Sequence, residues 1–195
     1  ALLSRVEVSS TFSFMVPNCH EAAVIYLGAT LAGMVVHPIL PSLRDHDLRF
    51  LLADAESKAI FIPATFRRFD YAAMLARVSA ELDQPPMTVV LRGEAMAGQT
   101  AFADIMAEEH ANPLPALDPD AVRMVMYTSG TTGRPKGVMH THNTINALIR
   151  QIGEHWHVAG GDKYLVPSPI SHIGGSIYAF EMPLLLGTTA VLMES

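Results

Sequence analysis

Short apolar runs recur along this chain and are separated by longer segments of mixed polarity. Each run is four to six residues long, which is the usual length of a buried strand. The segments expected to form strands are Thr11–Val16, Val35–Leu40, Lys58–Ile62, Thr88–Leu91, Val122–Tyr127, Val138–His142, Lys163–Val166 and Thr188–Met193. The longer segments between them are candidates for helices.

Helix-start signals support this division. Asn18 with Glu21, and Ser42 with Asp45, are spaced as the two members of a capping box. Helices are expected over Cys19–Gly33, Asp45–Ala53, Phe66–Leu82, Asn143 or Thr144 to Trp156, and Ile173–Leu186. Because strand and helix alternate with short connections, the pattern predicts an α/β fold with mainly parallel β-sheets flanked by helices.

One segment resembles a linker. Pro113–Pro119 reads Pro-Leu-Pro-Ala-Leu-Asp-Pro and interrupts the alternation of strand and helix. We therefore expect residues 1–112 to form a first α/β layer, with residues 120–195 following as a distinct region.

The composition is rich in apolar residues. Hydrophobic residues make up 50% of the chain and the mean hydropathy is +0.26, values typical of a membrane protein or of a piece of a larger globular protein. The longest apolar stretch, Ala22–Val36, is shorter than the ~20 residues of a membrane span, so a buried helix is favoured. Arg5 and Glu7 interrupt any signal peptide. An opening on Ala1 without methionine also favours a fragment.

Charge and cysteine content exclude several classes of function. The formal net charge is −6 and no basic cluster occurs, which argues against nucleic-acid and anionic-membrane partners. The single cysteine, Cys19, has no internal disulfide partner, which favours a cytoplasmic location. Cys19 is expected to be a small buried residue near a helix start rather than a nucleophile.

The segment that follows the run Val122–Tyr127 combines hydroxyl groups, glycines and a lysine. Such a segment suits anion capture, because glycines let backbone N–H groups approach a ligand and an ammonium group neutralises its charge. The candidate phosphate-binding residues are Thr128, Ser129, Gly130, Thr131, Thr132, Gly133, Lys136 and Gly137. This is not a Walker loop, because Lys136 follows Pro135 and Gly137 replaces the required Ser or Thr. We expect a flap between two strands.

The residues from Tyr127 to Val138 read Tyr-Thr-Ser-Gly-Thr-Thr-Gly-Arg-Pro-Lys-Gly-Val, with Thr141-His142 shortly after. This pattern resembles the signature of the acyl-adenylate-forming (AMP-binding) superfamily, which includes acyl-CoA synthetases, luciferases and the adenylation domains of peptide synthetases. Weaker similarity extends over the whole chain, and the chain is most similar to the N-terminal portion of an acyl-CoA synthetase. The resemblance implies that residues 120–195 hold the phosphate loop and the start of the acyl pocket, and that the C-terminal domain is absent.

The resemblance also implies an activity. In that family ATP activates a carboxylic acid as an acyl-adenylate, which coenzyme A then converts to a thioester, and Mg²⁺ accompanies the ATP phosphates with few protein ligands. Lys136 would be catalytic, because it would stabilise the charge that gathers on the departing pyrophosphate. His172, Gly174 and Gly175 would line the acyl pocket. A fatty, alicyclic or aromatic acid is favoured, and the ribose, magnesium and second-lysine positions of the family lie beyond Ser195.

Other interpretations remain open. Lys136 by itself could be a solvated lysine, the loop hydroxyls could satisfy turn backbone, and His172 could simply cap a helix. His140-Thr141-His142 and His155-Trp156-His157 have no acidic or cysteine ligand at a useful spacing, so no metal site is expected there. The parent protein could instead be an amino-acid-adenylating domain or a non-catalytic remnant. We expect this chain by itself to be inactive, with exposed apolar surface where the remainder of the enzyme docks.

Overall fold

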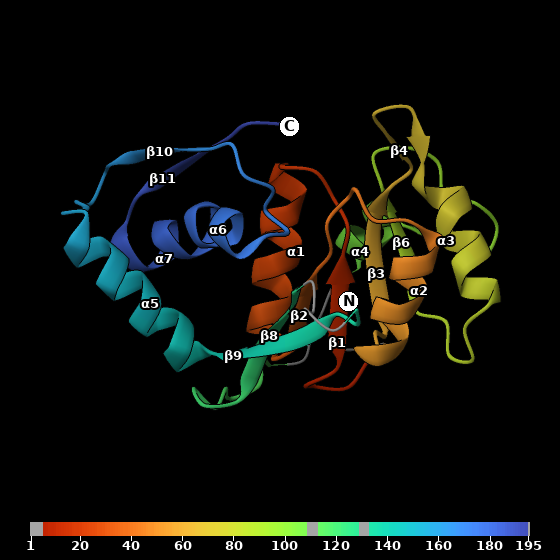
Figure 1. Ribbon diagram of the computed structural model, residues 1–195, viewed down its shortest axis with the longest axis horizontal. Helices are drawn as coiled ribbons and strands as arrows, with labels where there is room; N and C mark the ends of the chain where they lie inside the picture. Colours follow the sequence, from red (N-terminus) through yellow and green to blue (C-terminus); the bar gives the residue numbers. More distant parts are fainter. Residues whose placement is uncertain (1–5, 109–112, 129–132, 195) are drawn as a thin grey trace.

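The computed structural model describes residues 6–108, 113–128 and 133–194. Within these residues the largest element is a sheet with the strand order β7-β6-β3-β1-β2-β8-β9 (Figure 1). Its strands are β1 (Thr11–Phe14), β2 (Val35–Pro38), β3 (Ala59–Pro63), β6 (Met87–Leu91), β7 (Thr100–Ala101), β8 (Val122–Thr128) and β9 (Lys136–Thr141). Neighbouring strands from β7 to β8 are parallel, and only β9 runs antiparallel. The expected α/β fold with a mainly parallel sheet is confirmed.

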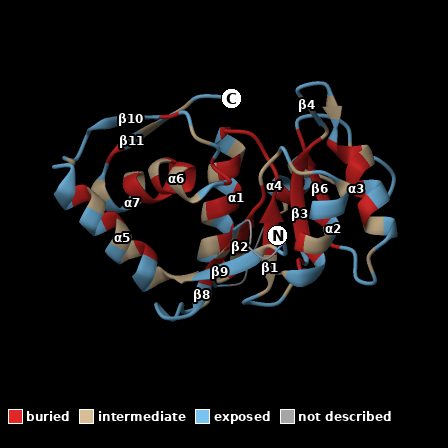
Figure 2. Cartoon of the chain, viewed as in Figure 1, coloured by how far each residue is buried: buried red, intermediate tan, exposed pale blue. Residues whose placement is uncertain are grey.

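Helices cover both faces of this sheet (Figure 1). The helices that cover it are α1 (His20–Leu31), α2 (Asp45–Asp54), α3 (Tyr71–Ala80) and α4 (Phe102–Ala107). After β9 come α5 (His142–His155), α6 (Ile173–Ser176), the π-helical segment η2 (Ile177–Glu181) and α7 (Met182–Leu186). Alternate strand residues face opposite ways. Phe61 of β3 therefore packs in one core cluster with residues of α1 and α4, whereas Ile60 packs in a second with residues of α2 and α3. Figure 2 shows these buried residues between the layers.

A second, smaller layer lies beside α1. Its strands β10 (Lys163–Val166) and β11 (Thr189–Leu192) form a parallel pair, and η2 and α7 of the continuous helical run α6-η2-α7 pack against them. Helix α5 packs against η2 and α7 (Figure 1). The apolar cluster on the α1 face of the main sheet continues without a break into this layer through Ile149, Val166 and Phe180. The main sheet with its helices, here called the first layer, therefore shares one core with the second layer. Residues 113–119 contain no helix or strand, and β8 and β9, which follow them in the chain, still belong to the main sheet.

Several local expectations are wrong. The expected helix Phe66–Leu82 begins only at Tyr71, because β4 (Thr65–Phe66) and β5 (Phe69–Asp70) first form a small hairpin. The Asp70 carboxylate then accepts a hydrogen bond from the Ala73 N–H and caps α3. Helix α5 begins at His142, with Thr141 as its N-cap and Thr144 as the reciprocal partner. The sequence analysis did not predict β7 and α4, which are only two and six residues long.

Asn18 does not cap α1. The N-cap residue is the buried Cys19, and no side chain caps this end of the helix. The Asn18 amide instead reaches into the second layer, where it donates to the carbonyl oxygens of Val166, Ser168 and Met193 at 3.0–3.1 Å. Its oxygen accepts the Ile170 N–H at 2.9 Å. One buried side chain therefore fastens the first layer to the second.

Replacing Asn18 with alanine is expected to lower the free energy of unfolding by at least about 2 kcal/mol, because each buried polar group left without a partner costs roughly 1–3 kcal/mol. Urea denaturation of the chain measures this. Asn143→Ala, which removes one exposed hydrogen bond to Asp120, is the matched control and should change little. Equal stability of both variants would contradict the fastening role of Asn18.

Candidate functional site

The phosphate-loop segment connects two paired strands. Thr128, at the end of β8, lies opposite Lys136, at the start of β9, and the antiparallel pairing continues to Thr141. The expected flap between two strands is confirmed, although its second strand begins at Lys136 rather than at Val138. The two ends of the segment are thus held side by side by the sheet.

The structure describes only part of the segment. Ser129, Gly130, Thr131 and Thr132 lie outside the described residues. Gly133 has φ +91°, a conformation that other residues rarely adopt. Lys136 and Gly137 are exposed on β9, and a Cβ at Gly137 would lie 3.0 Å from Val125 Cγ2. Glycine therefore suits position 133 because of its backbone conformation and position 137 because of packing, and both reasons are independent of any ligand.

Tyr127 fixes the base of this loop. Its hydroxyl donates to the Asp54 carboxylate at 2.6 Å, at the end of α2. Its ring lies 5.0 Å from the ring of His37, measured between centroids. Burial, followed by the hydrogen bond to Asp54, raises the pKa of Tyr127, so the phenol stays protonated and remains a donor. The start of the loop is therefore anchored to a helix on the opposite side of the sheet from α1.

A small cavity of about 110 Å³ brings Thr128 together with His172. Its other walls include His37 and Tyr127 of the main sheet and Ser171 and Ile173 of the second layer. The His37 ring is fully buried, and burial lowers its pKa to about 3, so it is neutral. The cavity thus lies where the loop strand of the first layer meets the start of α6 in the second.

His172 caps a helix as well as lining this cavity. It is the N-cap of α6, and its Nδ1 accepts the Gly174 N–H at 3.2 Å. The side chain is nevertheless exposed and lines the cavity beside Thr128. The capping role and the predicted pocket role are therefore compatible, because the bond to Gly174 holds the ring at the cavity wall.

The two glycines after His172 differ in their surroundings. A Cβ at Gly175 would lie 2.0 Å from the Pro169 carbonyl oxygen, so backbone fills that side of Gly175. A Cβ at Gly174 would have only His172 Nδ1 nearby, at 3.6 Å. Of the two predicted pocket glycines, Gly174 is the one with open space beside it, and neither is among the described residues that line the cavity.

A wider cleft of about 570 Å³ separates α2 from the far end of the loop. Gly133, Arg134 and Pro135 line one side, and residues of α2 that include His46, Arg49 and Phe50 line the other. Arg134 is exposed. Residues 133–135 therefore border open space on the α2 side.

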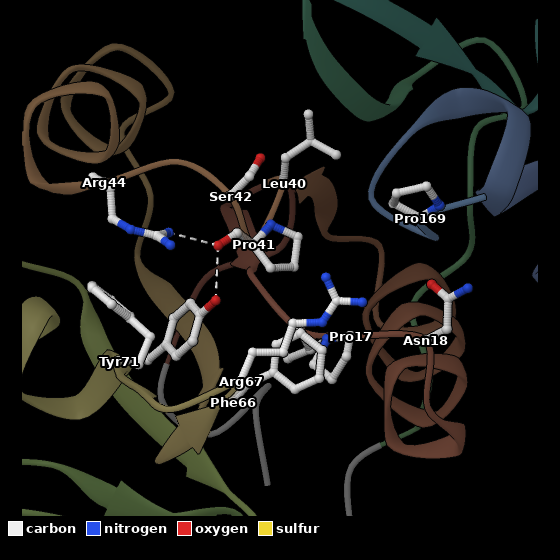
Figure 3. Close-up of a pocket in the computed structure, with 12 residues that line it drawn as sticks. Pro17, Asn18, Leu40, Pro41, Ser42, Arg44, Phe66, Arg67, Tyr71 and Pro169 are labelled. Carbon is white, nitrogen blue, oxygen red and sulfur yellow. Dashed lines mark hydrogen bonds between the residues drawn. The ribbon is translucent and has the colours of Figure 1, made fainter. Parts of the chain in front are cut away.

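A third cavity, of about 290 Å³, lies beyond the carboxyl ends of β1 and β2 (Figure 3). The connections that leave these two strands use helices on opposite faces, which is the position where open α/β sheets bind ligands. Two cations line this crevice. The Arg44 guanidinium donates to the Pro41 carbonyl oxygen at 2.8 Å and lies 4.1 Å above the Phe69 ring, and Arg67 lies beside Phe66.

The sequence did not single out this arginine crevice, the His37 ring or the Asp54 anchor. Arg44 and Arg67 lie in separate segments of the sequence, and only the fold brings them to one cavity. Arg67 and Arg68 have φ of +48° and +63°, a strained conformation that no sequence pattern marks. Within the described ranges, we find neither a group of three or more potential metal ligands nor a helix suited to crossing a membrane.

Comparison with known proteins gives one consistent result. The family model described as AMP-binding enzyme matches residues 1–195. The chain is 29% identical over 195 residues to the medium-chain fatty-acid–CoA ligase of Escherichia coli, and 31% identical over 182 residues to the sulfoacetate–CoA ligase of Cupriavidus necator. The two matches include 99% and 93% of this chain, but only 34% of the length of each relative.

Solved structures share the fold. Apo MatB from Rhodopseudomonas palustris superposes with a TM-score of 0.81 at 21% identity, covering 98% of this chain and 36% of that one. The acetoacetyl-CoA synthetase from Streptomyces lividans superposes with a TM-score of 0.85 at 22% identity, covering 99% of this chain and 31% of that one. At this identity the likeness concerns the fold alone.

Proposed function

The chain belongs to the AMP-binding enzyme family, and on that basis we propose that, within a longer enzyme, it activates a carboxylic acid with ATP and passes the acyl group to coenzyme A. The observation that carries the proposal is the arrangement of β8 and β9. This hairpin sets Lys136 opposite Thr128, and Thr128 shares a cavity with His172. A donor-rich loop and a candidate acid-binding segment are therefore neighbours.

The first step would join the carboxylate to the α-phosphorus of ATP. One carboxylate oxygen forms the new P–O bond, the bond to the bridging oxygen breaks, and pyrophosphate leaves with the electron pair. The Lys136 ammonium and the backbone N–H groups of the loop would neutralise the charge that develops on this leaving group. Thr128 would add a hydroxyl donor, and Mg²⁺ would arrive with the nucleotide.

The second step would be attack of a thiol on the acyl-adenylate carbonyl carbon, with release of AMP. Coenzyme A carries phosphates and an adenine ring in addition to its thiol. The crevice that contains Arg44 and Arg67 offers two guanidinium groups and several aromatic side chains, which suit such a ligand. We assign the phosphorylated end of coenzyme A to this crevice. His172 and Gly174 would face the acid, and a fatty, alicyclic or aromatic acid remains the proposed substrate class.

The remainder of the enzyme would dock on the second layer. Four large apolar side chains on β10, α7, β11 and the residue after β11 are 44–62% exposed, namely Leu165, Leu184, Val191 and Met193. A two-stranded sheet with apolar residues open to water is a natural place for further strands or helices to pack. A cytoplasmic location, expected from the single cysteine, is part of the same proposal.

The test is acid-dependent exchange of labelled pyrophosphate into ATP by the full-length protein, with a panel of fatty, alicyclic, aromatic and amino acids. We expect exchange with one of the first three groups and thioester formation when coenzyme A is added. A preference for amino acids would favour an amino-acid-adenylating domain. Failure to bind ATP would favour a non-catalytic remnant of the fold.

The 195-residue chain alone is expected to show no such exchange, because it spans about a third of the length of its relatives. The same exchange assay, applied to the purified chain at high concentration, measures this. Exchange above the rate of the Lys136→Ala chain would contradict the expectation.

A further inference from the structure

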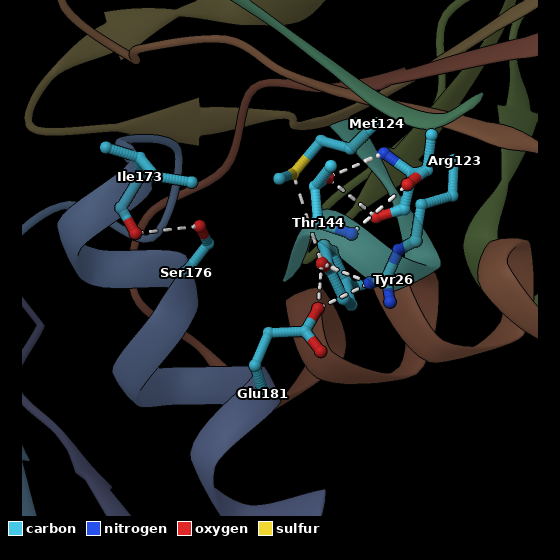
Figure 4. A network of polar contacts seen from close by, with 8 residues as sticks. Tyr26, Arg123, Met124, Thr144, Ile173, Ser176 and Glu181 are labelled. Atoms are coloured by element: carbon cyan, nitrogen blue, oxygen red, sulfur yellow. Dashed lines mark hydrogen bonds and ion pairs between the residues drawn. The ribbon is translucent and has the colours of Figure 1, made fainter. Parts of the chain in front are cut away.

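A buried charged cluster joins the two parts of the candidate site. Arg123 lies on β8, the strand that leads into the loop, and is 7% exposed. Glu181 lies on η2, which continues the helix that begins beside His172, and is 3% exposed. An Arg123 Nη atom donates to Glu181 Oε1 (Figure 4). The pair therefore connects the phosphate-loop strand of the first layer to the His172 segment of the second.

Tyr26 of α1 completes the cluster. Its hydroxyl accepts a hydrogen bond from Arg123 at 2.5 Å and donates to Glu181 Oε1 (Figure 4). Its ring stacks on Phe180, with centroids 4.4 Å apart, so the hydroxyl is fixed in place. Arg123 Nε has no hydrogen-bond partner among the described residues. The guanidinium is therefore buried with one of its N–H groups unpaired. Because removing charges from water costs free energy, stability alone is a weak explanation for this buried ion pair.

Both charged residues lie at irregularities of their elements. The register of the β8–β9 pairing shifts between Val122 and Met124, so Arg123 lies at a β-bulge. Glu181 is the last residue of a π-helical turn inside an otherwise α-helical run. A bulge redirects a side chain, and a π-helical turn shifts all later residues around the helix axis. The β-bulge and the π-helical turn therefore occur at Arg123 and Glu181, the two residues that form the ion pair.

We propose that Arg123 and Glu181 are positioning residues that hold the phosphate-loop strand and the His172 segment in register. The inference rests on the proposed function, because it concerns how the nucleotide and acid sites are aligned. Neither residue need touch a substrate. Apolar side chains of similar size could fill the same volume, but they would not fix the bulge and the π-helical turn against each other, because apolar contacts are not directional.

The experiment compares variants of the full-length protein. Arg123→Met alone leaves Glu181 buried and unpaired, so its thermal midpoint should fall, and the double variant Arg123→Met/Glu181→Leu should recover most of that loss. In the double variant we expect kcat for acid-dependent exchange to fall about tenfold while the KM for ATP stays within about twofold, because misalignment affects the reacting geometry more than binding. A double variant with the wild-type kcat would overturn the proposal.

Two further arms keep the result interpretable. Glu181→Gln preserves the shape of the side chain and removes its charge. It therefore tests the ion pair if the double variant does not fold. An unchanged kcat in this variant would again refute the proposal. Asp45→Asn/Arg77→Gln, which breaks an exposed ion pair on α2 and α3, is the matched control and should leave kcat unchanged.

Hydrogen exchange of the same proteins supplies a readout that needs no activity. The amides of Gly174–Ser176 and of Val138–Thr141 should exchange faster in the double variant, and unchanged protection would overturn the proposal. If wild-type protein shows no acid-dependent exchange of pyrophosphate, the proposed function fails. An active wild-type protein with unaffected variants would refute only the positioning role.

Discussion

Replacing Lys136 with alanine is expected to lower kcat for acid-dependent pyrophosphate exchange about 10²–10³-fold in the full-length protein. The reason is that negative charge gathers on the leaving pyrophosphate during the reaction, so the ammonium group contributes most in the transition state. Lys136 lies at the first position of β9, opposite Thr128, where the sheet holds its backbone. Steady-state kinetics with saturating acid and varied ATP measure the effect.

Arg134→Ala is the matched control for this prediction. Arg134 is another exposed cation of the same loop, two residues away, and neither the sequence nor the structure gives it a role. Its removal should change kcat by less than about threefold, as expected for the loss of a screened surface charge. If the two variants lost activity equally, the effect would come from net charge near the site rather than from Lys136, and the assignment of Lys136 would be wrong.

Replacing Gly175 with alanine is expected to destabilise the chain by about 3 kcal/mol or more, near the upper end for a single added methyl group. The new Cβ would lie 2.0 Å from the carbonyl oxygen of Pro169 and 2.5 Å from its carbonyl carbon. These are backbone atoms of the tight turn before α6, where the His172 N–H bonds to the same Pro169 oxygen at 2.9 Å. Urea denaturation measures the loss.

Gly174→Ala separates packing from substrate binding. The adjacent glycine has ordinary space for a Cβ, so alanine there should leave stability unchanged or raise it by up to about 1 kcal/mol through helix propensity. A fall in acid-dependent exchange without loss of stability would support the assignment of Gly174 to the acid site. Equal destabilisation by the two substitutions would contradict the steric argument for Gly175.

The sequence predicted the strands well because buried strands of a parallel sheet are continuous apolar runs with turn residues at each end. Ala59–Pro63 and Met87–Leu91 lie within about two residues of the expected segments. Sequence patterns predicted side-chain contacts less well, because the same polar side chain can cap a helix or bond to a distant segment. Asn18 is a residue type common at helix caps and has the right spacing to Glu21. Its amide instead bonds to four backbone groups that are about 150 residues or more away in the chain.

The candidate site divides in the same way. Loop residues such as Lys136 are contiguous, so their chemistry was readable directly. His37, Asp54 and Arg123 were missed, because an isolated polar residue inside or beside an apolar segment gives no sign of what it will meet. Tyr127 illustrates the limit, since it belongs to the recognisable loop signature, yet its partner Asp54 lies 73 residues earlier on another helix.

The sequence by itself determined the family, the alternation of strand and helix, and the residues available to bind phosphate, because all three depend on local order along the chain. Tertiary structure alone decided which of these residues are neighbours. The packing of the second layer against the main sheet brought Thr128 and His172 to one cavity, and the packing of the strand ends brought Arg44 and Arg67 to one crevice. The same packing of the second layer buried Arg123 against Glu181. Such contacts depend on how separate elements pack, and packing is set by the whole core rather than by any one segment.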